Sequence, residues 1–198
     1  MQRYTLRGAV LVMGAALSFL IPPTRDSRPN VDGPPVGHTG GFGEPTCQDC
    51  HLGNPLNAPG GILGVEGLPA AYRPNERYRI TLVLQSEDMG AAGFQTALRF
   101  SGGDHDGMQA GRLEPYDTRV VVRTDHSTGV EYAQHTGQGS MVEPGALAVW
   151  SFFWTAPREE GVVTLHAAAN SGNGDNSPLE DLIYTIQETT RATSTPNR

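Results

Sequence analysis

Three large aromatic residues occupy alternate positions in one short run of the chain. Trp150, Phe152 and Trp154 lie within residues 146–155, and Ser151 and Phe153 stand between them. Alternate residues of a β-strand point to the same face of a sheet, whereas in a helix these positions would spread around the axis. The spacing therefore predicts a strand whose aromatic face packs inward, and it favours a fold built from β-sheets.

Further strand-length segments follow, separated by turns. Strand structure is expected to begin at Ile62 and to include residues 78–84, 94–100, 118–123, 131–136, 146–155, 162–169 and 182–187. The 198 residues include 25 glycines and 15 prolines, and only 18% are charged, which suits a turn-rich β domain. We therefore predict an all-β, antiparallel β-sandwich of about seven to nine strands over residues 62–188. A disordered tail is expected at residues 189–198.

The first 23 residues have the pattern of an export signal. Arg3 and Arg7 precede an apolar segment, residues 8–21, which Pro22 and Pro23 terminate. The apolar segment has the length of a signal peptide and is shorter than a usual membrane span. It predicts an exported protein that is periplasmic, at the cell surface or extracellular, with a membrane contact only if this segment stays uncleaved.

Residues 24–61, here called the leader, are rich in glycine and proline and are expected to be irregular. They contain both cysteines of the chain, in the run Cys47-Gln48-Asp49-Cys50-His51. In an exported protein a Cys-x-x-Cys-His run is typical of a covalent c-type haem site. The two thiols can reach the two vinyl groups on one porphyrin edge, and the adjacent histidine can bind the iron as proximal ligand. The sequence thus predicts one haem c, held by Cys47, Cys50 and His51.

Other interpretations of the cysteine pair stay open. Cys47 and Cys50 can form a short-loop disulfide, act as a thioredoxin-like redox pair, or supply half of a zinc site. A thioredoxin-like pair needs a βαβ setting, which the surrounding residues do not show, and a structural zinc site needs four ligands. The main alternative is therefore an extracytoplasmic binding or cell-surface module without haem, in which a Cys47–Cys50 disulfide closes the leader.

A six-coordinate haem needs a second axial ligand, which is often Met or His. His38 lies in the leader and can fold back over the iron, so it is the candidate distal ligand. His135 and His166 fall in strand-like segments and are expected to be structural. The full set of candidates after the N-terminal segment is His38, His105, His126, His135, His166, Met89, Met108 and Met141.

An oxygen-rich loop near the C-terminus forms a second candidate site. Its side chains are Asn173, Asp175, Asn176, Glu180 and Asp181. Calcium favours oxygen ligands, but the order of these residues does not fit an EF-hand loop. The same residue types are common in ordinary turns. Calcium is therefore a second candidate cofactor, with a plain turn as the alternative.

Charge and motif content exclude some functions. The net charge is −7, and it becomes about −9 once the segment carrying Arg3 and Arg7 is removed. An acidic chain without a basic stripe is a poor binder of nucleic acid. The chain contains no nucleophile elbow, P-loop or HExxH run, so its motifs give no positive case for an enzyme.

Several segments resemble the reelin-type, or reeler, domain. They are Gly93-Phe94-Gln95, Gln134-His135-Thr136 and residues 150–157 (WSFFWTAP). Residues 167–184 (AAANSGNGDNSPLEDLIY) are similar to bacterial relatives often labelled choice-of-anchor V domains. In those relatives a Thr-Gly-x-x-Gly-Glu-x-Thr-Cys-x-x-Cys-His leader precedes the sandwich, as residues 39–51 do here. The resemblance covers residues 37–187 and implies an immunoglobulin-like β-sandwich.

Taken together, these features favour an exported electron-transfer protein. One c-type haem would be tethered to a β-sandwich, and its iron would exchange an electron with a redox partner protein.

Overall fold

The structure, a computed structural model, describes residues 30, 32–143, 145 and 147–193. The predicted export signal lies outside the described residues, as do the first residues of the leader and residues 194–198. In the part that is described, no helix is long and apolar enough to span a membrane.

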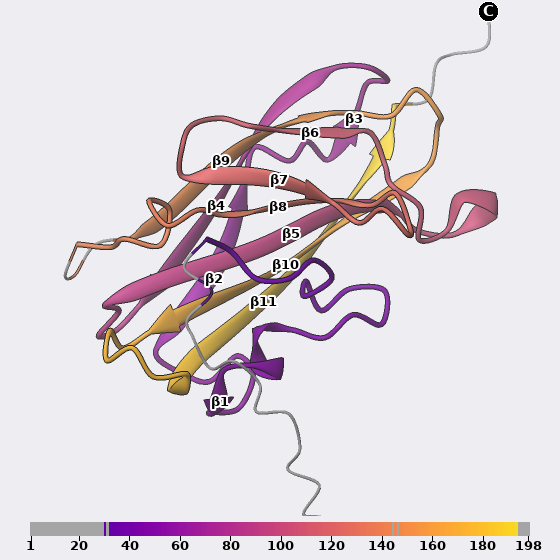
Figure 1. Cartoon of the computed structure of the whole chain (residues 1–198). Helices are drawn as coiled ribbons and strands as arrows, with labels where there is room; N and C mark the ends of the chain where they lie inside the picture. Colours follow the sequence, from indigo (N-terminus) through magenta and orange to yellow (C-terminus); the bar gives the residue numbers. More distant parts are fainter. Residues whose placement is uncertain (1–29, 31, 144, 146, 194–198) are drawn as a thin grey trace, which may run out of the picture.

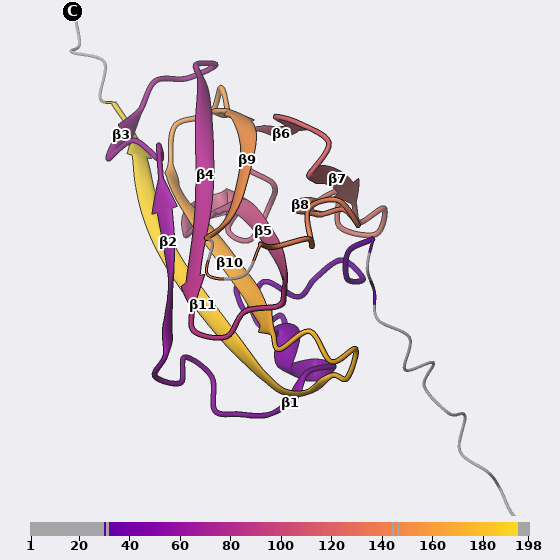
Figure 2. The ribbon, with the colours of Figure 1, turned by 90° about the vertical axis from the view of Figure 1, so that its left-hand side faces the viewer.

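Two β-sheets pack face to face (Figures 1 and 2). The larger sheet has the strand order β1-β11-β10-β5-β8-β7, with β3 paired to β11, and the smaller sheet has the order β2-β4-β9-β6. Only β1 and β3 pair with their neighbour in parallel; the other described pairs are antiparallel. The predicted all-β sandwich is therefore confirmed.

Nine of the described strands have four or more residues, and β1 and β3 have two. The elements are η1 (Cys47–Asp49), β1 (Leu52–Gly53), β2 (Gly61–Glu66), β3 (Ala71–Tyr72), β4 (Arg77–Ser86), β5 (Ala91–Phe100), η2 (Gly103–His105), β6 (Arg112–Pro115), β7 (Val120–Thr124), β8 (Glu131–His135), β9 (Ala148–Thr155), β10 (Val162–Gly172) and β11 (Leu179–Ala192). Both η elements are single 3₁₀ turns.

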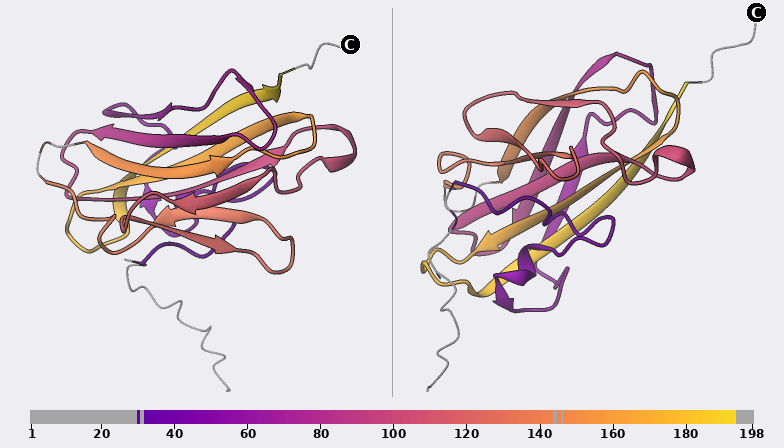
Figure 3. Two further views of the ribbon diagram at one scale, coloured as in Figure 1. Left: turned by 90° about the horizontal axis from the view of Figure 1, so that it is seen from above. Right: turned by 45° about the vertical axis from the view of Figure 1, so that its right-hand side comes forward.

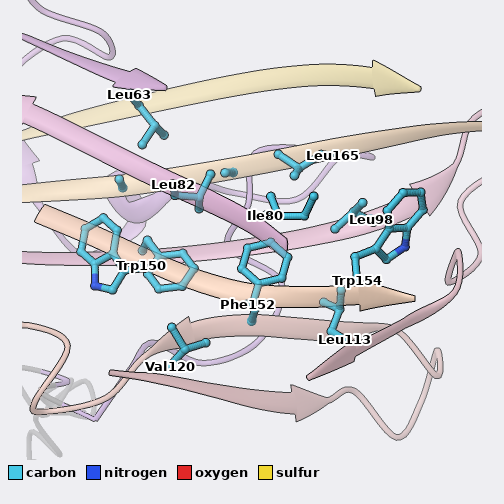
Figure 4. Packing of buried hydrophobic residues seen from close by; sticks show 14 of the residues in the cluster. Leu63, Ile80, Leu82, Leu98, Leu113, Val120, Trp150, Phe152, Trp154 and Leu165 are labelled. Atoms are coloured by element: carbon cyan, nitrogen blue, oxygen red, sulfur yellow. The ribbon is translucent and has the colours of Figure 1, made fainter. Parts of the chain in front are cut away.

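The aromatic residues of β9 fill the space between the sheets, as their spacing predicts. Trp150, Phe152 and Trp154 are fully buried, and Figure 4 shows them among leucine and isoleucine side chains from strands of both sheets. Each indole N–H also has a partner, because Trp150 Nε1 donates to the Gly139 carbonyl and Trp154 Nε1 to the Ala110 carbonyl, both at 2.8 Å. Both indole donors of the core are therefore paired, as buried Trp N–H groups usually are.

The last strand, β11, extends further toward the C-terminus than the sequence predicts. Residues 189–192 belong to β11 and are not part of a disordered tail, because Thr189 pairs with Thr164 and Thr190 with Val163. Thr190 is also buried. This correction has a simple cause. The polar Ser/Thr/Arg composition suggests solvent exposure, whereas the backbone of β10 offers hydrogen-bond partners that extend the ladder regardless of side-chain polarity.

The leader lies along the outer face of the larger sheet. In Figure 1 its indigo and purple trace crosses in front of β5, β10 and β11 before reaching β1. Figure 2 places it on the side of the larger sheet that faces away from β2 and β4. Figure 3 shows η1 and β1 close to the beginning of β11. The Cys-x-x-Cys-His run is therefore held at one end of the sandwich.

Candidate functional site

The two cysteines lie on one short turn. The Thr46 hydroxyl caps this 3₁₀ turn by accepting a hydrogen bond from the Gln48 N–H at 3.2 Å, and the His51 N–H donates to the Cys47 carbonyl at 2.9 Å. Side chains three positions apart eclipse each other in a 3₁₀ turn, so Cys47 and Cys50 project from the same side. Cys47 is half-buried and Cys50 is exposed.

The Cys47 thiol is held in its protonated form. Desolvation raises its pKa to about 12, and the nearby Cys50 adds to the shift. A thiol–disulfide redox centre depends on a thiolate with a lowered pKa. The environment of Cys47 therefore counts against the thioredoxin-like interpretation of the pair.

His51 is anchored by residues that are distant in sequence. Its Nδ1 atom lies 2.5 Å from Oδ2 of Asp181, a residue that is only 3% exposed. The Asn170 amide, on β10, lies beside the same ring, with Nδ2 3.2 Å from His51 Nδ1 and 3.4 Å from Asp181 Oδ2. The remaining ring nitrogen, Nε2, has a contact of only 3.5 Å with Asn170 Nδ2, at the outer limit of a hydrogen bond.

Backbone pairing explains why His51 and Asp181 meet. The two residues that follow His51 form β1, which pairs in parallel with the start of β11: Leu52 lies opposite Leu179, and Gly53 lies opposite Asp181. Asn54 adds a side-chain hydrogen bond, because its Nδ2 donates to the Glu180 carbonyl at 2.7 Å. The motif histidine is thereby fixed to the strand that carries its carboxylate.

His38 lies close to the cysteine turn. Its Nδ1 is 3.0 Å from the Pro35 carbonyl, and its Nε2 is 3.7 Å from Asp49 Oδ2. Its backbone N–H donates to Gln95 Oε1 at 2.6 Å. Since Asp49 belongs to η1, the structure brings the predicted distal ligand and the cysteine run into the same neighbourhood.

Charged and polar side chains hold the rest of the leader to the sheet. Glu44 forms an ion pair with Arg99 of β5 at 2.7 Å, and it accepts a hydrogen bond from the Tyr132 hydroxyl at 2.5 Å. Gln95 donates to the Pro35 carbonyl and to Gln134, each at 2.9 Å. Burial and the Glu44 carboxylate together raise the pKa of Tyr132, so this hydroxyl stays a donor.

Glycine permits the close approach of leader and sheet. A Cβ on Gly41, in the leader, would run into the ring of His166 on β10. Phe42 then covers His166 edge-on, with ring centroids 5.3 Å apart. His166 is thus packed beneath the leader, as a structural histidine would be.

The remaining distal candidates are placed elsewhere. The Nδ1 atom of His135 accepts a hydrogen bond from the Phe94 N–H at 3.0 Å, which agrees with the structural role expected of this histidine. Met89 is buried in the core, whereas the other four candidates are exposed at the surface: His105, His126, Met108 and Met141. Among the candidates in the described residues, His38 is the one that contacts the cysteine turn, through Asp49.

The oxygen-rich loop uses its side chains to close turns. Asn173 Oδ1 accepts from the Asp175 N–H at 3.0 Å, Asp175 Oδ1 from the Ser177 N–H at 2.7 Å, and Asp181 Oδ1 from the Asn173 N–H at 3.3 Å. No group of three or more His, Cys, Asp or Glu side chains in the described part is placed to hold a metal ion. Calcium at this loop stays a prediction from sequence alone.

Sequence reasoning missed the residues that support His51 and the leader. The sequence predicts Asp181 only as a candidate calcium ligand, and it does not single out Asn170, Glu44 or Arg99 as site residues. A usable indication exists nonetheless: Gln95, Gln134, Asn170 and Asp181 all lie within the segments that resemble reeler domains. Those segments meet at the leader.

Comparison with known proteins gives distant similarities. No family model matches the chain, and no curated protein matches it. Among solved structures, it is similar to the human F-spondin reeler domain (20% identity, TM-score 0.45, 67% of this chain and 89% of that one). It is also similar to the Reelin-N domain of F-spondin, with 18% identity and a TM-score of 0.48 over 75% of this chain and 96% of that one. A cohesin module from Clostridium perfringens is another neighbour, with 11% identity and a TM-score of 0.42 over 69% of this chain and 98% of that one. The neighbours thus include reeler domains, and the assignment of the fold rests on the strands described above.

Proposed function

We propose that this protein is an exported, monohaem c-type cytochrome-like electron-transfer protein. Cys47 and Cys50 would carry the haem through thioether bonds, and His51 would be the proximal ligand. The observation that carries the proposal is the contact between His51 Nδ1 and the buried carboxylate of Asp181. A histidine that binds a metal usually donates its other ring N–H to a carboxylate or carbonyl. His51 has this arrangement, which leaves Nε2 for the iron.

The surroundings of the motif fit an attached porphyrin. Leu52 and Leu179 lie opposite each other in the β1–β11 pair, directly after His51, and are 55% and 53% exposed. Paired leucines that stay exposed cost hydrophobic free energy unless another apolar surface covers them. A porphyrin bound to the neighbouring cysteines would provide such a surface.

His38 supports a six-coordinate site. Its Nδ1 has an acceptor in the Pro35 carbonyl, which directs the ring proton to Nδ1 and leaves Nε2 with a lone pair. We propose His38 as the distal ligand on this basis.

The division of roles follows from these contacts. The bound haem would supply a one-electron redox couple. Cys47 and Cys50 would anchor it, His51 would be oriented by Asp181, and the leader would be kept on the sheet by Glu44 and its partners. The redox partner would be another exported protein.

Periplasmic expression together with the cytochrome c maturation machinery tests the proposal. We expect a red protein with a sharp reduced α-band whose colour survives acid–acetone extraction. The Cys47→Ser/Cys50→Ser double variant should be colourless and should keep the far-UV circular dichroism of a β protein. A colourless wild-type chain would contradict the proposal and favour a binding module without haem.

A further inference from the structure

We infer that Asp181 lowers the reduction potential of the iron by acting through His51. Asp181 is a positioning residue in this role, since it touches the ligand and not the metal. The inference rests on the proposed function and deepens it, because it concerns how the chain controls its own proximal ligand.

The carboxylate of Asp181 is buried, and apart from His51 its partners within the described residues are neutral. Oδ1 accepts from the Asn173 N–H at 3.3 Å, and Oδ2 contacts the neutral Asn170 amide at 3.4 Å and His51 Nδ1 at 2.5 Å. His51 is the one ion-pair partner found for Asp181 in this part of the chain. The chain contains no lysine at all, and no arginine lies within residues 159–190.

This arrangement acts on the imidazole electronically. A carboxylate that accepts the Nδ1–H of a metal-bound histidine makes that histidine a more basic ligand. Burial strengthens the effect because the interaction takes place at a lower effective dielectric than in water. A negative charge at this position stabilises the ferric state relative to the ferrous state, so the potential falls.

The geometry is also fixed from both sides. The β1–β11 pairing sets His51 next to the strand that carries Asp181, and the Asn54 side chain ties the following segment to the Glu180 carbonyl at 2.7 Å. Asn170 approaches from β10 and completes the enclosure of the carboxylate. The contact therefore belongs to the folded sandwich and would persist when the iron is bound.

Spectroelectrochemical titration of the holoprotein tests the inference. Asp181→Asn retains the shape of the side chain but removes its charge, so its midpoint potential should shift upward from that of the wild type. Asp181→Glu restores a carboxylate and should return the potential toward the wild-type value. Asp175→Asn removes an exposed charge from the same loop and should leave the potential unchanged. An Asp181→Asn potential equal to that of the wild type, at equal haem content, would overturn the inference.

A second substitution gives a shift of the opposite sign. Asn170→Ala removes a neutral donor from Asp181 Oδ2, which leaves more of the carboxylate charge directed at His51. Its potential should therefore fall below that of the wild type. An unchanged or higher potential in Asn170→Ala would count against the inference. This test remains available even if Asp181→Asn does not fold.

A measurement without haem separates this inference from the proposed function. In the Cys47→Ser/Cys50→Ser chain, ¹⁵N NMR should show His51 as the Nδ1–H tautomer, and Asp181→Ala should shift it toward Nε2–H. An unaffected tautomer would overturn the role of Asp181 even if the wild type binds haem. A wild type without haem, but with the predicted tautomer shift, would instead overturn the proposed function and with it the effect on potential.

Discussion

Glu44 in the leader and Arg99 on β5 form a 2.7 Å ion pair across 55 residues of sequence. Their side chains are only 13% and 15% exposed. The Arg99 guanidinium also lies 4.5 Å from the centroid of the Phe42 ring, and Tyr132 donates to the same Glu44 carboxylate. These contacts make the leader a fixed part of the surface of the sandwich.

Glu44→Gln should loosen this attachment. The substitution leaves Arg99 largely buried without its anion and weakens the bond from Tyr132, so we expect a loss of about 1.5–3 kcal/mol in the free energy of unfolding. Urea unfolding measures it, and limited proteolysis should cleave the leader faster. Glu76→Gln is the matched control, because the Arg73–Glu76 pair is exposed and longer, at 3.8 Å. Equal losses in the two variants would show that Glu44 does not hold the leader.

Trp154→Ala tests the aromatic core. The side chain is fully buried and packs against the rings of Tyr72 and Tyr78. Removing it should cost about 3–5 kcal/mol of stability, because the surrounding core cannot close the cavity. Phe153→Ala is the control, since this half-buried ring faces outward beneath Arg77. An unchanged melting midpoint for Trp154→Ala would contradict the packing described here.

His38→Ala tests the distal ligand. Loss of this imidazole should convert a low-spin iron spectrum to a high-spin one, because a six-coordinate site would lose its second strong ligand. His126→Ala, at an exposed turn residue, should leave the spectrum unchanged. An unaltered low-spin spectrum in His38→Ala would exclude it as the distal ligand and return the other candidates to consideration.

Stability should fall in mild acid because of His135, which is buried, and His166, which is half-buried. Burial lowers the pKa values of His135 and His166 below the ordinary value of 6.5, so in the window just below that value the unfolded chain binds more protons than the folded chain. The free energy of unfolding therefore decreases as the pH falls through this window toward the lowered folded-state values.

Urea unfolding at about pH 7.5 and about pH 5.5 brackets this window. His135→Gln should show a smaller decrease between the two conditions than the wild type, whereas His126→Gln should match the wild type. If His135→Gln and the wild type lost the same stability, protonation of His135 would not be the cause.

Local sequence patterns predict the fold, but they do not predict the residues that hold His51 in place. The alternation at Trp150, Phe152 and Trp154 predicts a buried strand because the period of a strand is visible within a few residues. The contact between His51 and Asp181 spans 130 residues and depends on the two-residue strand β1, which is too short to produce a pattern. The sequence shows that Asp181 can act as an oxygen ligand or acceptor, but it does not show that the partner of Asp181 is His51.

Residues 189–192 show where composition misleads, because their polar side chains predict a disordered tail. Thr189 and Thr190 look like solvent-exposed residues by composition, yet they extend the β10–β11 ladder, since backbone pairing does not require apolar side chains. Composition alone therefore places the end of the domain too early.

Intact mass after periplasmic expression with the cytochrome c maturation machinery tests the central claim most directly. Covalent haem at Cys47 and Cys50 should add about 616 Da to the mature chain, and Cys47→Ser/Cys50→Ser should abolish the addition while the β fold remains. A wild-type mass lower than that of the reduced chain by about two hydrogens, with no haem, would establish a Cys47–Cys50 disulfide and contradict the account.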